Sequence, residues 1–476
     1  MNTSSPATHG ESRQRKFVRD VGIYAIGNIG AKLITFLMVP LYTHFISDTA
    51  DFGYYDVCLT ACFLLLPLVS LQLRDGAFRF LLECDDTQSR TRVVTTVYRT
   101  LAVSLALSLC LLATASMWLQ VDYVWWSLAL LVSMAIQEVV MQVYRGLGNN
   151  RAFVTVGILT ALGIGLFSLF FVVVLRWGVE GIFAANIAAR LLAIALVELR
   201  VGSVKRYFAL GIDVSAMRRE LLRYSLPLLP GALCWWIMGS SDRWFILHYL
   251  GPADTGVYAV AVRFTGVIQT LGIIFYQAWQ ETAIRQYNSP DRNSFFSLML
   301  NAYAWLLAAL LVAYTIGLKV CYPWLVAQQY QASLAYVFPL GCIAAIMAIV
   351  AFFDMGYQCT KDTVRTLPAI VVGAIVNIVA NVVLTPRWGV PGTLAAGILT
   401  YLVLVVYRWH DMRRYFTLRL QWRTALALAI VAVTAVVFYA QWPLWADVAA
   451  AVALLALCIA CAPPRVRHLV VHRPRQ

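Results

Sequence analysis

The sequence predicts an all-α integral membrane protein with about 14 transmembrane helices, arranged as two pseudo-symmetric six-helix lobes and two further C-terminal helices. Three observations lead to this prediction: an apolar composition, the distribution of basic residues, and an internal repeat. Of the 476 residues, 61% are hydrophobic and only 13% are charged, whereas soluble proteins carry about 25% charged residues. Lipid solvates such an excess of apolar surface, because it surrounds the protein from outside.

Apolar segments of about 20 residues, the length that crosses a bilayer, follow one another along the chain. The predicted spans are 21–46, 55–73, 93–117, 123–143, 153–175, 179–199, 224–248, 256–279, 295–318, 334–355, 364–386, 389–407, 424–441 and 444–462. The spans group into an N-lobe at 21–199, a C-lobe at 224–407 and a C-terminal pair at 424–462. The predicted cytoplasmic parts are a leader at 1–20, an inter-lobe linker at 200–223, a loop at 408–423 and a tail at 463–476.

The net charge of +14 would suit a nucleic-acid binder if it formed one basic domain. The Lys and Arg residues instead form short clusters between the apolar segments. Outside the predicted spans, all of them except Arg176, Lys319 and Arg387 lie in the termini and the even-numbered connections. An excess of basic residues marks the cytoplasmic side. We therefore expect a multi-pass membrane protein with both termini in the cytoplasm, and no nucleic-acid partner.

Two pairs of segments repeat along the chain. Residues 176–185 read RWGVEGIFAA and residues 387–396 read RWGVPGTLAA, each joining the fifth to the sixth span of its lobe. Residues 50–57 read ADFGYYDV and residues 253–260 read ADTGVYAV, each at the second span of its lobe. The repeat indicates duplication of a six-helix unit. Because six is even, both copies keep the same orientation in the membrane.

Several of these segments resemble the Wzx-type polysaccharide flippases of the MOP exporter superfamily. They are GNIGAKLITFLMVPLYTHFISDTADFGYYDV at 27–57, QLRDGAFRFL at 72–81, SDRWFILHYLGPADTGVYAVAVRF at 241–264 and the two RWGV turns. The resemblance covers about residues 20–410. It implies a two-lobed transporter of the bacterial cytoplasmic (inner) membrane that works by alternating access. Its cargo would be undecaprenyl-diphosphate-linked oligosaccharide repeat units for surface polysaccharide biosynthesis. Implied partners are this glycan, membrane lipids, and polysaccharide polymerase or chain-length proteins.

Basic residues inside the predicted spans are the candidates for binding an anionic substrate. A cation at mid-bilayer costs about 2.5–3.5 kcal/mol on insertion scales, so it needs protein, water or an anion around it. Near an interface the alternative is snorkelling, as for Arg99. For Arg243 the alternative is an ion pair with Asp242, and for Arg74 and Arg79 it is ordinary cytoplasmic charge. The candidates for a cationic cavity and its cytoplasmic approach are Lys32, Arg190, Arg243, Arg263, Arg74 and Arg79.

Carboxylates and amides in the spans are candidates for ion coupling. Glu138 and Asp242 are the deeper carboxylates. The resemblance extends to lipid II flippases, in which a sodium site implies Asp242, Asn377, Asn381 and Thr393 as matching positions here. Hydrogen bonding between helices is the alternative role of the two asparagines. We expect no cofactor and no bound metal centre, but coupling to Na⁺ or H⁺.

Prolines in the first helix of each lobe are candidate hinges, because proline removes a backbone hydrogen bond. They are Pro40, Pro227 and Pro230. A static kink is the alternative.

No nucleotide-binding GxxxxGK[ST] motif and no HExxH motif is present, so we predict a transporter and not an enzyme. Two other functions remain open. A MATE-like ion-coupled exporter of small organic cations would need an acidic cavity. A membrane glycan ligase or polymerase would need a large external loop, whereas the longest external connection, near 319–333, is short.

Overall fold

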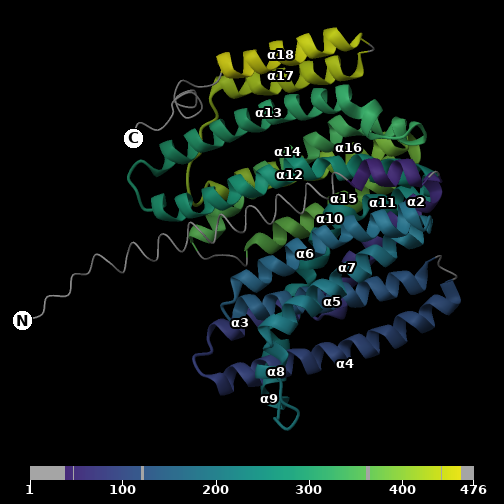
Figure 1. Ribbon diagram of the computed structural model, residues 1–476. Helices are drawn as coiled ribbons and strands as arrows, with labels where there is room; N and C mark the ends of the chain where they lie inside the picture. The colour runs from purple at the N-terminus through teal and green to yellow at the C-terminus, as the bar shows by residue number, and fades with distance from the viewer. Residues whose placement is uncertain (1–37, 47, 120–122, 361–364, 441, 462–476) are drawn as a thin grey trace, which may run out of the picture. The chain divides into compact units, whose positions relative to one another are not determined.

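The computed structural model describes residues 38–46, 48–119, 123–360, 365–440 and 442–461. These residues form helices and connections without a strand among them (Figure 1). The predicted all-α fold class is therefore confirmed. Most of the first predicted span lies outside the described residues. Of the part that is described, residues 38–45 are helical.

The helices of the first half follow the predicted spans with shifted ends, except that α3 lies in a predicted connection. They are α2 (Thr49–Val69), α3 (Leu73–Leu82), α4 (Thr87–Leu119), α5 (Val124–Gly146), α6 (Asn150–Ser168) continued by the π-helix η1 (Leu169–Val174), and α7 (Gly178–Val201). Leu71 and Gln72 both have positive φ angles, 50° and 51°, which end α2 and give α3 a new direction.

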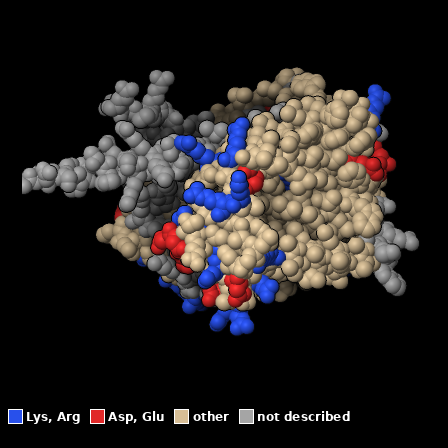
Figure 2. Space-filling model, turned by 60° about the horizontal axis from the view of Figure 1, so that its bottom comes forward, with Lys and Arg blue, Asp and Glu red and all other residues tan. Residues whose placement is uncertain are grey.

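The second half follows the same pattern. Its helices are the 3₁₀ turn η2 (Leu226–Leu228), α10 (Leu229–Ser240), α11 (Asp242–Leu250), α12 (Pro252–Gln286), α13 (Arg292–Leu325), the 3₁₀ helix η3 (Gln328–Ser333), α14 (Leu334–Cys359), α15 (Thr366–Trp388), α16 (Val390–Met412), α17 (Trp422–Tyr439) and α18 (Leu444–Cys461). In the described part of the chain, 10 helices are long and apolar enough to cross a membrane, and α17 and α18 contain shorter apolar helices. Figure 2 shows most of the charged side chains of one face gathered in one part of it and a few at the opposite edge, with a broad uncharged area between them.

The chain divides into two compact units. The first contains the described residues of 1–46 and 58–233, and the second those of 47–57 and 234–476. Helix α2 therefore begins in the second unit, and its residues from Cys58 onward belong to the first. The lobe boundaries inferred from membrane topology stay a prediction.

In the first unit, the linker between the predicted lobes is folded onto α4. It forms α8 (Ser203–Tyr207) and α9 (Ser215–Ser225). The Arg99 guanidinium donates hydrogen bonds to the carbonyls of Ile212 at 3.0 Å and Ala209 at 3.2 Å, and the Thr95 hydroxyl donates to the Tyr207 carbonyl. Arg99 thus holds the linker, a role that sequence alone did not indicate.

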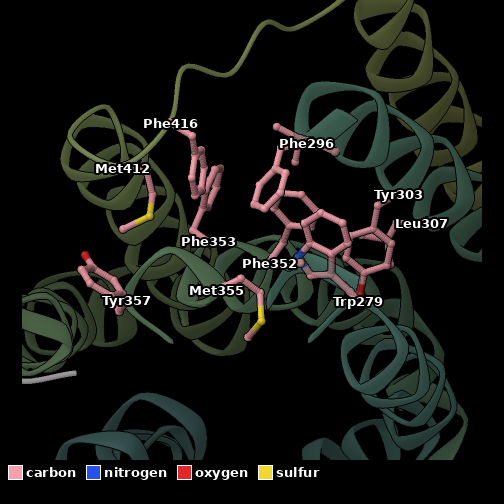
Figure 3. Packing of buried hydrophobic residues seen from close by; sticks show 12 residues of the cluster. Trp279, Phe296, Tyr303, Leu307, Phe352, Phe353, Met355, Tyr357, Met412 and Phe416 are labelled. Carbon is pink, nitrogen blue, oxygen red and sulfur yellow. The ribbon is translucent and has the colours of Figure 1, made fainter. Parts of the chain in front are cut away.

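In the second unit, aromatic side chains join four helices into one core. Figure 3 shows Trp279 of α12, Phe296 of α13, Phe352 of α14 and Met412 of α16 in this cluster. The rings of Trp279 and Phe352 stack with centroids 4.7 Å apart. Such ring pairs add to the energy of burial and fix the orientation of the helices.

Polar contacts attach the C-terminal helices to α13. The Lys319 ammonium binds Asp447 of α18 at 2.8 Å and the carbonyl of Ala440, just after α17, at 2.8 Å. At the other end, the Asn301 side chain accepts from the backbone N–H of Gln421 and donates to the carbonyl of Arg419. Helices α17 and α18 therefore pack as part of the second unit, as two separate helices.

Candidate functional site

Two of the predicted intramembrane arginines meet at a single carboxylate in the second unit. Arg243 of α11 donates through Nε to Asp56 of α2 at 2.7 Å, and the Nη2 atom of Arg263 on α12 lies 3.9 Å from the other Asp56 oxygen. The three side chains are only 10%, 7% and 12% exposed. At 1.5 Å per residue, they lie about 10–16 Å from the helix ends on the predicted external side. Buried charges at this depth require such partners.

Aromatic rings enclose this charged cluster. The guanidinium carbon of Arg263 lies 4.5 Å from the ring centroid of Phe52 and 5.8 Å from that of Tyr55. The Phe52 ring in turn meets Tyr330 edge-on, with centroids 5.8 Å apart. Cation–π contacts of this kind stabilise a guanidinium where water is scarce.

Two glycines bring α2 and α12 close enough to form the cluster. A Cβ atom on Gly53 would lie 2.8 Å from the Gly256 nitrogen, and one on Gly256 would lie 3.0 Å from the Gly53 nitrogen and overlap the Thr49 carbonyl. These glycines occupy the same position in the repeated segments 50–57 and 253–260. The repeat therefore supplies both surfaces of one close helix crossing.

The predicted ion-coupling residues of the second unit also come together. Asn377 accepts from Ser241 at 2.9 Å, Asn381 donates to Asn377, and Thr385 links Asn381 to Thr393 at 3.1 and 2.9 Å. This network joins Ser241, just before α11, to α15 and α16. Asn377 bonds between helices, to Ser241 and Thr400, whereas Asn381 bonds to Asn377 and Thr385 within α15.

Asp242 lies next to this network, and the ion pair with Arg243 that was the alternative role for that arginine is formed by Asp56 instead. One carboxylate oxygen accepts from the Tyr258 hydroxyl at 2.9 Å. The other, Oδ1, is buried and has no hydrogen-bond partner among the described residues. Arg243 pairs with Asp56 instead, because neighbouring residues on a helix point in different directions.

Three further predicted arginines and Glu138 belong to the first unit. Arg74 binds Glu138 at 2.5 Å, Arg79 forms an exposed pair with Glu83, and Arg190 donates to the side chain of Asn186 at 2.9 Å. Arg74 was a candidate for binding the substrate and Glu138 a candidate for ion coupling, and the structure pairs the two. Their roles in transport stay predictions.

Other predicted positions are placed less informatively. Lys32 lies outside the described residues. Pro40 lies within the helical residues 38–45, Pro227 lies in η2, and Pro230 lies in the first turn of α10. The chain stays helical from α9 through η2 to α10, and the hydrogen bonding changes from α to 3₁₀ at Pro227, as expected where proline removes a backbone donor. The hinge role stays a prediction.

Sequence reasoning missed several residues. Asp56 lies in the repeated segment ADFGYYDV, one residue inside the predicted span 55–73. A carboxylate at that position was the sequence signal that could have identified it. Arg408 was counted with the charges of the cytoplasmic loop 408–423, which was wrong. Helix α16 continues to Met412, and Arg408 is fully buried there against Asp354 of α14.

The fold and the site define a polytopic helical membrane protein that buries a charged cluster at bilayer depth. Residues 17–279 match the family described as "Polysaccharide biosynthesis protein". The chain belongs to this family. A comparison with curated proteins gives no match.

Solved structures with the same fold are membrane transporters. The chain is similar to the lipid II flippase MurJ in its inward closed conformation, with a TM-score of 0.72 and 12% identity over 95% of this chain and 100% of that one. It is also similar to an inward-facing multidrug resistance MATE family transporter of the MOP superfamily, with a TM-score of 0.66 and 12% identity over 82% of this chain and 98% of that one. At this identity the likeness shows a shared fold.

Proposed function

We propose that this chain is a flippase that moves undecaprenyl-diphosphate-linked oligosaccharide repeat units across the bacterial cytoplasmic membrane by alternating access. The observation that carries the proposal is the cluster in which Arg243 and Arg263 share Asp56. It occurs in a chain of the polysaccharide biosynthesis family with the fold of a lipid II flippase structure.

The chemistry of a lipid-linked diphosphate suits such arginines. The diphosphate loses hydration when it leaves the water, and charge-assisted hydrogen bonds from guanidinium groups offset that loss. Arginine is the preferred residue because its planar fork matches phosphate oxygens and stays charged. A diphosphate that reaches this depth would compete with a single carboxylate for two guanidinium groups.

The two alternative functions are less well supported. An exporter of organic cations needs an acidic site, whereas this cluster sets two arginines against the single carboxylate of Asp56. A ligase or polymerase needs an external loop that carries catalytic groups. The described connection between α13 and α14 consists mainly of the six-residue helix η3.

We further propose that transport is coupled to Na⁺ or H⁺ at Asp242. Its unpartnered oxygen supports this proposal, together with the amide and hydroxyl oxygens of Asn377, Asn381 and Thr393 nearby on α15 and α16. Oxygen ligands suit a hard cation, and a buried carboxylate also suits a proton. Asp242→Asn should leave protein abundance unchanged and abolish the dependence of transport on the ion gradient. A variant with full, gradient-dependent transport would contradict the coupling role.

A deletion strain tests the proposed function. Surface polysaccharide should be lost, lipid-linked repeat units should accumulate in the inner leaflet, and the wild-type chain should restore export. Arg263→Gln and Lys32→Ala should restore it poorly, whereas Arg218→Gln, which changes an exposed residue of α9, should restore it fully. Unchanged polysaccharide in the deletion strain would contradict the proposal.

A further inference from the structure

The start of α2 is attached to the second unit through ion pairs, ring contacts and close backbone packing. Asp56 supplies two ion pairs, and Gly53 and Gly256 bring the backbones together. The Tyr330 hydroxyl adds a long hydrogen bond of 3.3 Å to the Asp48 carbonyl. Of these attachments, the ion pairs are the ones that an anionic ligand can replace.

Asp56 is the anion with which both arginines pair. It lies between two guanidinium groups, and its carboxylate uses Nε of Arg243 and approaches Nη2 of Arg263. A diphosphate offers more oxygen acceptors than a carboxylate and suits the same forked donors. A guanidinium group whose donors bind a phosphate cannot also keep its full contact with Asp56.

We infer that Asp56 is an internal counter-anion, which the diphosphate of the cargo displaces from Arg243 and Arg263, and that this displacement releases the start of α2 from α11 and α12. The inference rests on the proposed function and names the residue that couples binding to movement. Helix α2 is suited to this coupling, because from Cys58 onward it is packed in the first unit. A ligand shifts an equilibrium between conformations by binding one of them more tightly. Here the diphosphate would bind more tightly to the conformation in which Asp56 no longer contacts the two arginines.

Binding measurements on the full chain in nanodiscs test the exchange, with undecaprenyl diphosphate as the probe. Asp56→Asn removes the competing charge but keeps an oxygen acceptor, so the probe should bind about tenfold tighter than to the wild type. Asp56→Glu should bind close to the wild type, and Arg263→Gln should bind at least about tenfold more weakly. The matched control is Asp447→Asn, which alters a carboxylate paired with Lys319 in the same unit and should leave the affinity unchanged.

Spin labels test the release of α2. Cysteines replacing Asp48 and Gln328, both exposed, would carry the labels in a chain whose native cysteines are replaced. Undecaprenyl diphosphate should lengthen the distance between the labels in the wild type, and undecaprenyl monophosphate should do so less. In Asp56→Asn the longer distance should appear without the probe.

The outcomes separate the two proposals. If the wild type binds the probe but Asp56→Asn binds it equally or more weakly, Asp56 is a structural partner and the exchange is overturned while the flippase proposal stands. Binding as inferred with an unchanged label distance overturns the release of α2. A wild type that does not bind the probe overturns both the exchange and the proposed function.

Discussion

At the residue scale, Arg408 shows what a charge requires inside this fold. Its side chain is fully buried. The Nη1 atom contacts Asp354 and the Val350 carbonyl, whereas Nε and Nη2 have no hydrogen-bond partner among the described residues. Asp354 is thus the charged partner of a cation that water does not reach.

Removing that partner should be costly. Asp354→Leu leaves Arg408 buried without a counter-charge, which is expected to lower the free energy of unfolding by about 3–5 kcal/mol. Thermal unfolding of the purified protein, followed by tryptophan fluorescence, measures the effect. The double variant Asp354→Leu/Arg408→Met should recover most of the loss, because neither charge is then buried alone. A double variant no more stable than the single one would contradict this interpretation.

Charged residues were partly predictable from the sequence. A basic residue within an apolar window is visible at once, so Arg243 and Arg263 were identified as intramembrane residues. Their partner was not, because the contact joins α2 to α11 and α12 across almost 200 positions. The Arg408 error arose at a helix end, where a few residues decide whether a charge faces water or the protein interior.

At the element scale, the crossing of α2 and α12 depends on glycine. A Cβ atom on Gly256 would overlap backbone atoms of Thr49, which cannot rotate away. Interfaces between membrane helices use small residues for this reason. The two glycines are equivalent in the repeat, so duplication supplied both at once.

Gly256→Ala should therefore separate the two helices. We expect a loss of transport and lower thermal stability, with a cost of about 1–3 kcal/mol from overpacking. The matched control is Gly239→Ala in α10, where a Cβ atom meets no heavy atom within 4 Å and alanine also favours the helix. Equal behaviour of the two variants would show that the crossing tolerates a side chain.

The start of α17 depends on Asn301. The side chain of this residue is fully buried, accepts from the Gln421 N–H at 2.9 Å and donates to the Arg419 carbonyl at 3.0 Å. Asn301→Ala should cost about 1–2 kcal/mol locally and increase cleavage by trypsin after Arg419, with little effect on transport. An unchanged cleavage rate would contradict a role of Asn301 in fixing this segment.

Most elements were predictable because a membrane span has one dominant signal, a long apolar segment. Irregularities carry no such signal. The break at Leu71–Gln72 arises from two positive φ angles, and the folding of the linker onto α4 arises from contacts between distant residues, such as Arg99 with Ile212.

At the scale of the whole molecule, the charge distribution predicts the orientation in the membrane. In a cysteine-free background, Arg387→Cys should react with a membrane-impermeant maleimide applied to intact spheroplasts. Arg218→Cys should react only after permeabilisation. Both residues are exposed, so a difference in labelling reports the side of the membrane. The reverse pattern would contradict the predicted topology.

The transport of a lipid-linked glycan is the central claim for the molecule. Its most direct test uses the purified chain in liposomes that contain a fluorescent undecaprenyl-diphosphate-linked saccharide and an imposed ion gradient. The fraction of saccharide accessible to an added glycosidase measures transfer between leaflets. We predict that the wild-type chain makes the inner-leaflet saccharide accessible and that Arg263→Gln does so at a rate near that of empty liposomes. Transfer by the wild type at the rate of empty liposomes would contradict the claim.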